Sequence, residues 1–149
     1  MEILNAISDR LKNVDNTVVR TEPKSPPPVL KNGNGQKQAD ILSKFENTTH
    51  KNTVFHQRWD SNFRNDLFKN IAIELIRLDA QHIVIETTLD ESLLIKSDLQ
   101  EKRLYIELFF IDEEPLYEVV INIYFNQNHI FGTAGITKTV FPKVHKFLL

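Results

Sequence analysis

The sequence predicts an α+β fold in which an antiparallel meander sheet of about five strands is covered on one face by a long helix and a C-terminal helix. An N-terminal amphipathic helix on a Pro/Gly linker is expected to precede this domain. Two observations indicate the class. Residues 103–125 alternate with a period of two, and helical patterns lie before and after the strands instead of between them, which favours α+β over α/β.

The most informative stretch is residues 103–125, which predicts two long strands joined by an acidic turn. Alternate positions share a face of a strand. One face is wholly apolar, with Leu104, Ile106, Leu108, Phe110, Tyr117, Val119, Ile121, Ile123 and Phe125. The other face is mixed, with Tyr105, Glu107, Phe109, Glu118, Val120, Asn122 and Tyr124. This asymmetry is typical of an antiparallel sheet that helices cover on one side only.

At the N-terminus, Glu2–Val14 predicts an amphipathic helix within an arm of residues 1–20. Its apolar stripe is Ile3, Leu4, Ile7, Leu11 and Val14. A helix of about three turns is marginal alone in water, so another surface is expected to cover the stripe. That surface is either the protein's own domain, or a partner or second copy that the helix binds.

Residues 21–38 predict a linker, because four prolines are followed by an Asn-Gly-Asn-Gly run. Residues 39–149 are expected to form a single domain that starts with a short helix over Ala39–Glu46. Next comes an apolar stripe with a spacing close to four, which predicts a helix over Thr53–Asp79 or one that restarts near Asp60, where Asp60 or Ser61 would cap it. The stripe contains Phe55, Trp59, Phe63, Leu67, Ile71, Leu75 and Leu78.

Strands are expected over His82–Thr88 and Ser92–Ser97, before the central pair, and over His129–Thr133 after it. Residues 126–128 predict the tight turn that returns this last strand. Thr137–Phe147 predicts the closing helix, in which Pro142 is tolerable only in the first turn.

Composition excludes several classes of chemistry. The chain has 149 residues, no cysteine and a formal net charge of -2. Disulfides, thiolate metal sites and cysteine nucleophiles are therefore excluded, and no global positive field favours nucleic acid. The first residues predict neither a secretory signal nor a membrane-spanning helix, so a cytoplasmic protein without membrane contact is expected.

Candidate catalytic groups are few. His50 and His56 lack the spacing of a metal-binding helix motif, and no phosphate-binding or dinucleotide-binding glycine pattern is present, so neither metal nor cofactor is expected. An enzyme remains an alternative if dispersed residues meet on the mixed face of the sheet. Its candidates are His82, His129, Tyr105 and Tyr124.

The sequence thus favours a non-catalytic interaction protein, an adaptor or complex subunit that binds a protein partner or its own copy. Two surfaces are candidates: the apolar stripe of the N-terminal helix and the mixed sheet face, represented by Tyr105, Glu107, Phe109, Glu118, Asn122 and Tyr124. A second alternative is single-stranded nucleic-acid binding through Arg58, Trp59, Phe63 and Arg64.

Overall fold

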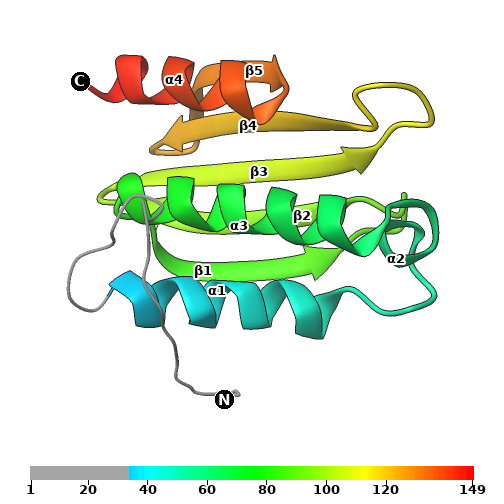
Figure 1. Ribbon diagram of the computed structural model, residues 1–149. Helices are drawn as coiled ribbons and strands as arrows, with labels where there is room; N and C mark the ends of the chain where they lie inside the picture. Colours follow the sequence, from blue (N-terminus) through cyan, green and yellow to red (C-terminus); the bar gives the residue numbers. More distant parts are fainter. Residues whose placement is uncertain (1–33) are drawn as a thin grey trace, which may run out of the picture. The chain divides into compact units, whose positions relative to one another are not determined.

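The structure, a computed structural model, describes residues 34–149 (Figure 1). Three sequence predictions lie outside the described residues: the helix over Glu2–Val14, its apolar stripe, and residues 21–33 of the expected linker.

The described chain forms four helices and five strands. In chain order they are α1 (Asn34–Thr48), α2 (Val54–Arg58), α3 (Ser61–Arg77), β1 (Gln81–Thr87), β2 (Leu93–Leu99), β3 (Lys102–Phe110), β4 (Tyr117–Phe125), β5 (Asn128–Gly135) and α4 (Thr137–Leu148).

The strands form one antiparallel sheet in the order β1-β2-β3-β4-β5, so each strand pairs with its neighbour in sequence. The meander predicted from sequence is therefore confirmed. In the central pair, Ile106 lies opposite Ile121 and Leu108 opposite Val119, which places the predicted apolar residues on one face.

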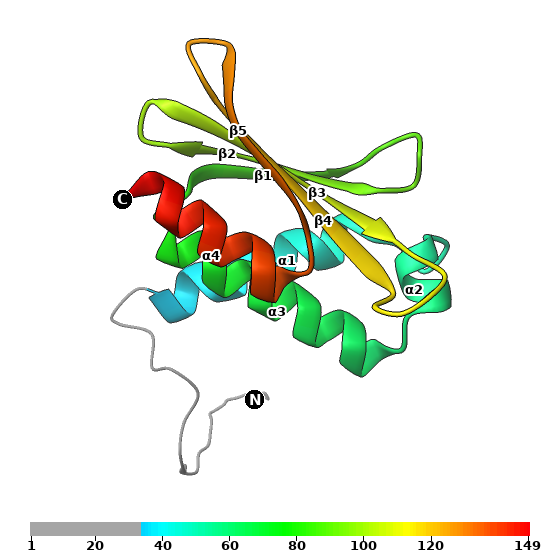
Figure 2. The ribbon, with the colours of Figure 1, turned by 90° about the horizontal axis from the view of Figure 1, so that it is seen from above.

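Helices α1, α3 and α4 lie on the same side of the sheet (Figure 2). The helix α1 contacts α3 and β1, and α4 contacts α3, β4 and β5. Side chains that are fully buried beneath these helices come from the middle strands, and they include Leu104, Ile106, Leu108, Val119, Ile121 and Ile123. The prediction that the long helix and the C-terminal helix cover the apolar face is confirmed.

The long helical stripe is interrupted at Trp59, as one of the two sequence alternatives predicted. Trp59 has an extended backbone, with φ of -97° and ψ of 139°, and ends α2. Asp60 then caps α3, because its side chain accepts a hydrogen bond from the Phe63 N–H at 2.9 Å. The break lets Trp59 reach the sheet, where its indole N–H donates to the Leu116 carbonyl at 3.0 Å.

Helix α1 is longer than the expected Ala39–Glu46 helix, since it begins at Asn34 and includes residues 34–38 of the expected linker. Gln36, Lys37 and Gln38 are good helix formers, and Gln36 Nε2 donates to Asp40 Oδ1 at 2.9 Å. Packing of Ile41 and Phe45 stabilises the helix, which then extends toward its N-terminus into these residues.

Pro142 also differs from expectation, because α4 starts at Thr137 and Pro142 therefore lies beyond its first turn. The prediction that Pro142 would lie in the first turn was wrong. Proline has no N–H group, so Pro142 cannot donate a hydrogen bond to the carbonyl of Lys138, four residues earlier. Because Lys138 is exposed, water can donate to this carbonyl instead. Val140, Phe141 and Val144 are fully buried on the opposite side, and this packing holds the helix together.

We expect Phe45→Ala to destabilise the domain by about 3–5 kcal/mol, because Phe45 is fully buried and stacks on Phe68 with ring centroids 4.3 Å apart. Chemical denaturation measures this change. Phe45→Leu, which keeps most of the volume, should cost less than half as much. A loss below ~1 kcal/mol for the alanine variant would show that α1 is not part of the core.

Candidate functional site: the outer face of the sheet

The surface of the sheet that faces away from the helices is here called the outer face. Among the described residues no helix lies on it (Figure 2). The register places on it all six residues that the sequence analysis proposed as a partner-binding surface. Tyr105 lies opposite Asn122, Phe109 lies opposite Glu118, and Glu107 and Tyr124 alternate with them. Neighbouring strands add Leu94, Lys96 and Asp98 from β2 and His129, Gly132 and Ala134 from β5.

An aromatic cluster occupies one end of the outer face. The rings of Tyr105 and Tyr124 meet edge to face, with centroids 5.5 Å apart at an angle of 88°. The ring of His129 contacts Tyr124 at 5.2 Å. His129 Nε2 lies 2.8 Å from Asn122 Oδ1, and because an amide oxygen only accepts, the histidine nitrogen donates. These contacts hold four side chains of three strands in fixed positions.

Gly132 provides the space for this cluster. A Cβ atom at this position would lie 2.9 Å from Asn122 Oδ1 and 3.1 Å from both Cε1 and Nε2 of His129. The glycine therefore leaves room for the His129 ring to reach Asn122. The shape of the outer face at this point thus depends on Gly132 having no side chain as well as on the side chains around it.

Beside the cluster, the outer face is hollowed into an open trough of about 730 Å³. The trough lies between the tips of the β2–β3 and β4–β5 hairpins, which point away from the helices in Figure 2. Two-residue turns form the tips, with positive φ at Gln100 (59°) in one and at Asn126 (51°) and Gln127 (68°) in the other. The lining residues are Glu101, Arg103, Tyr105, Asn122, Tyr124, Asn126 and Gln127.

Ion pairs fix much of the charge on the outer face. Arg103 Nε lies 3.1 Å from Asp98 Oδ1, and its guanidinium lies 5.7 Å from the centre of the Tyr105 ring. Lys96 pairs with Glu86 at 2.7 Å. Carboxylates nevertheless outnumber basic groups, since Glu101 and Glu118 have no ion-pair partner within residues 34–149.

Glu107 is held differently from the other carboxylates of the outer face. It accepts a hydrogen bond from the buried Ser92 hydroxyl at 2.5 Å, and that hydroxyl is also 2.7 Å from Thr88 Oγ1. This chain of hydrogen bonds ties the β1–β2 turn to β3. Of the two glutamates predicted for the mixed face, Glu107 therefore has a structural role and Glu118 is the one available to a partner.

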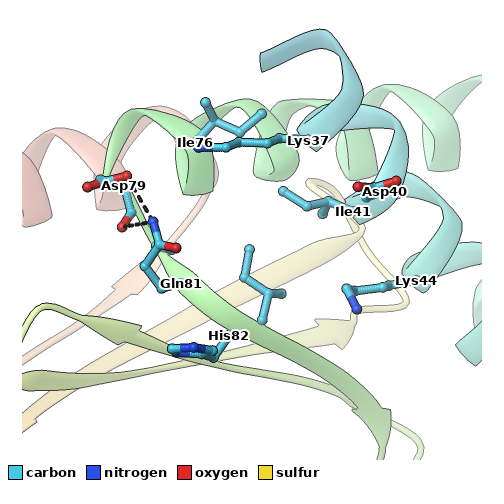
Figure 3. A pocket seen from close by; sticks show the side chains of 10 residues that line it. Lys37, Asp40, Ile41, Lys44, Ile76, Asp79, Gln81 and His82 are labelled. Carbon is cyan, nitrogen blue, oxygen red and sulfur yellow. Dashed lines mark hydrogen bonds between the residues drawn. The ribbon is translucent and has the colours of Figure 1, made fainter. Parts of the chain in front are cut away.

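A second pocket, of about 170 Å³, lies between α1 and β1 (Figure 3). Its floor is apolar, and its rim carries Lys37, Asp40, Lys44, Asp79 and His82. In Figure 3 Gln81 points toward Asp79, to whose Oδ1 it donates at 3.0 Å. His82 Nδ1 lies 2.9 Å from Asp98 Oδ2, so of the two histidines named for the enzyme alternative it is His129 that contacts a tyrosine ring.

Two further histidines, His56 and His145, make local contacts. His56 Nε2 lies 3.1 Å from Thr49 Oγ1, and burial, helped by the charge of Arg64, lowers the pKa of His56. His145 Nε2 lies 3.1 Å from Glu74 Oε1. Within the described part of the chain, no three His, Asp or Glu side chains are arranged to hold a metal ion.

The residues proposed for base stacking are engaged in the fold. Trp59 is only 3% exposed, and Phe63 is half-buried with its ring centroid 5.4 Å from that of Trp59. Arg58 pairs with Asp112 at 2.6 Å and lies 5.0 Å from the centre of the Phe110 ring. Trp59 is therefore a core residue, and Arg58, one of the two arginines proposed for nucleic-acid binding, is paired within the domain.

Comparison with known proteins adds no information on function: the chain matches no protein-family model, curated protein or solved structure. None of the helices formed by residues 34–149 is long and apolar enough to cross a membrane.

We expect Gly132→Ala to displace His129 from Asn122, because the added methyl group would occupy the same space. The imidazole resonances of His129 should shift, and the lost hydrogen bond should lower stability by about 1 kcal/mol. Gly35→Ala is the control, since a Cβ at Gly35 meets nothing within 4 Å. Unchanged His129 resonances in Gly132→Ala would show that the cluster does not depend on this glycine.

Proposed function

We propose that this protein is a non-catalytic interaction protein that binds a protein partner through the outer face of its sheet. The proposal rests on one observation, that helices cover only one face of the sheet within residues 34–149. Helices α1, α3 and α4 all lie on this face, here called the inner face, while the outer face carries aromatic and apolar side chains. Leu94, Tyr105, Phe109, Val120 and Tyr124 are all half-buried there.

The composition of the outer face supports this proposal. Tyrosine and arginine are enriched at the centres of protein interfaces, where large side chains bury much area at a small entropic cost. Here Tyr105 and Tyr124 are already held by contacts with Arg103 and His129. Because these side chains are ordered before binding, a partner loses less free energy to fixing them.

Charge favours a basic partner over a second copy. Glu101 and Glu118 add uncompensated negative charge to the outer face. A two-fold interface between identical outer faces would bring these carboxylates toward one another, which is unfavourable. A partner with basic side chains around an apolar centre complements the same surface.

The enzyme alternative keeps one supporting observation, the grouping of His129 with Tyr105 and Tyr124 beside the trough. However, His129 donates through Nε2 to Asn122, and the trough is open to water instead of closed around a substrate. Catalysis in such a site would lack the water-excluded environment that strengthens electrostatic stabilisation. The interaction proposal therefore has the stronger support.

We further propose that the N-terminal arm provides a second contact with the partner. Its motivation is the amphipathic pattern of Ile3, Leu4, Ile7, Leu11 and Val14, a stripe of the kind that binds in a hydrophobic groove. Once the domain has bound the partner, the linker keeps the arm close to it, at a high effective concentration. The apparent affinity of the whole protein for the partner is thereby raised.

Glu118→Lys should reduce partner capture by about tenfold, because it reverses the charge of a carboxylate on the outer face that has no ion-pair partner within residues 34–149. Asp66→Lys is the matched control, since Asp66 is exposed on α3, away from the outer face. Quantitative affinity capture from native cells compares the two variants, and light scattering reports any self-association. Equal capture by both variants, or a dimer that Glu118→Lys abolishes, would contradict the proposal of a basic partner.

Deletion of residues 1–33 should leave the thermal unfolding midpoint within about 2 °C of the full chain, because residues 34–149 contain a continuous core. Capture of the partner should weaken in the same variant. Replacing Ile7 and Leu11 by serine in the full chain provides a milder test of the same stripe. A large fall in the midpoint on deletion would show that the arm stabilises the domain instead of binding a partner.

A further inference from the structure

We propose that the trough between the two hairpin tips is a binding site for an arginine side chain of the partner. This inference rests on the proposed function and specifies which group of a basic partner enters the outer face. Its basis is the combination of charge, aromatic surface and hydrogen-bond acceptors that the trough presents.

The charge of the trough favours a cation. The trough is lined by one basic side chain, Arg103, and one carboxylate, Glu101. Arg103 is neutralised by Asp98, whose Oδ1 lies 3.1 Å from Arg103 Nε. Glu101, at the β2–β3 tip, has no such partner within residues 34–149. The trough and its immediate surroundings therefore carry one carboxylate in excess, and a guest cation restores neutrality.

The aromatic walls favour the same guest. Tyr105 and Tyr124 meet at 88°, so that together they form a corner with two differently oriented ring surfaces. A cation over such a ring is attracted by its electron-rich face. The protein itself provides an example, because the Arg103 guanidinium lies 5.7 Å from the centre of Tyr105.

Shape distinguishes arginine from lysine. A guanidinium is flat, stacks on an aromatic ring and presents several N–H donors in one plane. The lining provides acceptors for these donors in the Glu101 carboxylate and in the side-chain carbonyls of Asn126 and Gln127. An ammonium group is compact and more strongly hydrated, so it would gain less in an open trough of about 730 Å³.

Other guests fit less well. A phosphate or carboxylate would face the excess negative charge of Glu101. A neutral planar group would contact the tyrosines, but it would leave that charge uncompensated. The difference between a charged guest and a neutral guest of the same shape is therefore the decisive measurement.

The experiment titrates the full-length protein with N-acetyl-arginine amide, and with the citrulline and lysine analogues, while NMR follows the tyrosine ring signals. Citrulline is the uncharged isostere of arginine. Arginine should shift the signals of Tyr105 and Tyr124 in a saturable way, and citrulline and lysine should bind at least about threefold more weakly. Tyr117, on the inner face, is an internal reference and should not shift.

Two variants make the test specific. Glu101→Gln should weaken arginine binding by about two- to fivefold, and the effect should shrink as salt is raised. Glu113→Gln, at the exposed β3–β4 loop, is the matched control and should bind like the unaltered protein.

Equal binding of arginine and citrulline, or an unchanged affinity in Glu101→Gln, would overturn the arginine site. Absence of any saturable shift would do the same. These outcomes are distinct from failure of the proposed function, because partner capture by Asp66→Lys and its loss in Glu118→Lys do not depend on the trough.

Discussion

The whole structure depends on burial of one face of the β3–β4 pair. Leu104, Ile106, Leu108, Val119, Ile121 and Ile123 are all fully buried. Removing a large aliphatic side chain of this kind from water stabilises by roughly 1.5–3 kcal/mol. The helices are arranged to provide that burial: α3 contributes its apolar side, and α1 and α4 pack beside it. Tyr117 links the layers, because its hydroxyl accepts the Thr137 N–H at 3.0 Å where α4 begins.

The position of α1, α3 and α4 on one side of the sheet has a consequence for the other side. A strand that buries alternate residues must present the intervening ones to the opposite surface. Glu107, Val120 and Tyr124 lie on the outer face because Ile106, Ile121 and Ile123 lie on the inner face. The residues of the outer face are thus fixed by those of the core. A one-residue shift in register would exchange the two sets and so disrupt the core and the outer face together.

Most of the fold follows from sequence because its signals are local. The period of two in residues 103–125 predicted both faces of the sheet, and Asp60 predicted the start of α3. The errors arose where packing overrides local preference. Helix α1 extends back to Asn34 because its packed part, where Phe45 stacks on Phe68, stabilises a helix that the residues before it can continue. Pro142 is accommodated in α4 because Phe141 and Val144 are buried. Neither contact can be read from neighbouring residues.

The trough shows a different limit, because its members depend on how hairpin tips and registers combine. The sequence placed Tyr105, Asn122 and Tyr124 on one face and grouped His129 with the tyrosines only in the enzyme alternative. It did not place Gly132 or Glu101 beside them. A register irregularity between Ile123 and Tyr124 sets Tyr124 opposite His129, whereas Ile123 lies opposite Phe131. With regular pairing, Tyr124 would lie opposite Ile130, and His129 would not be directly across from it. The site therefore depends on one extra residue in β5. This bulge brings His129 next to Tyr124, and Gly132 leaves room for the histidine ring.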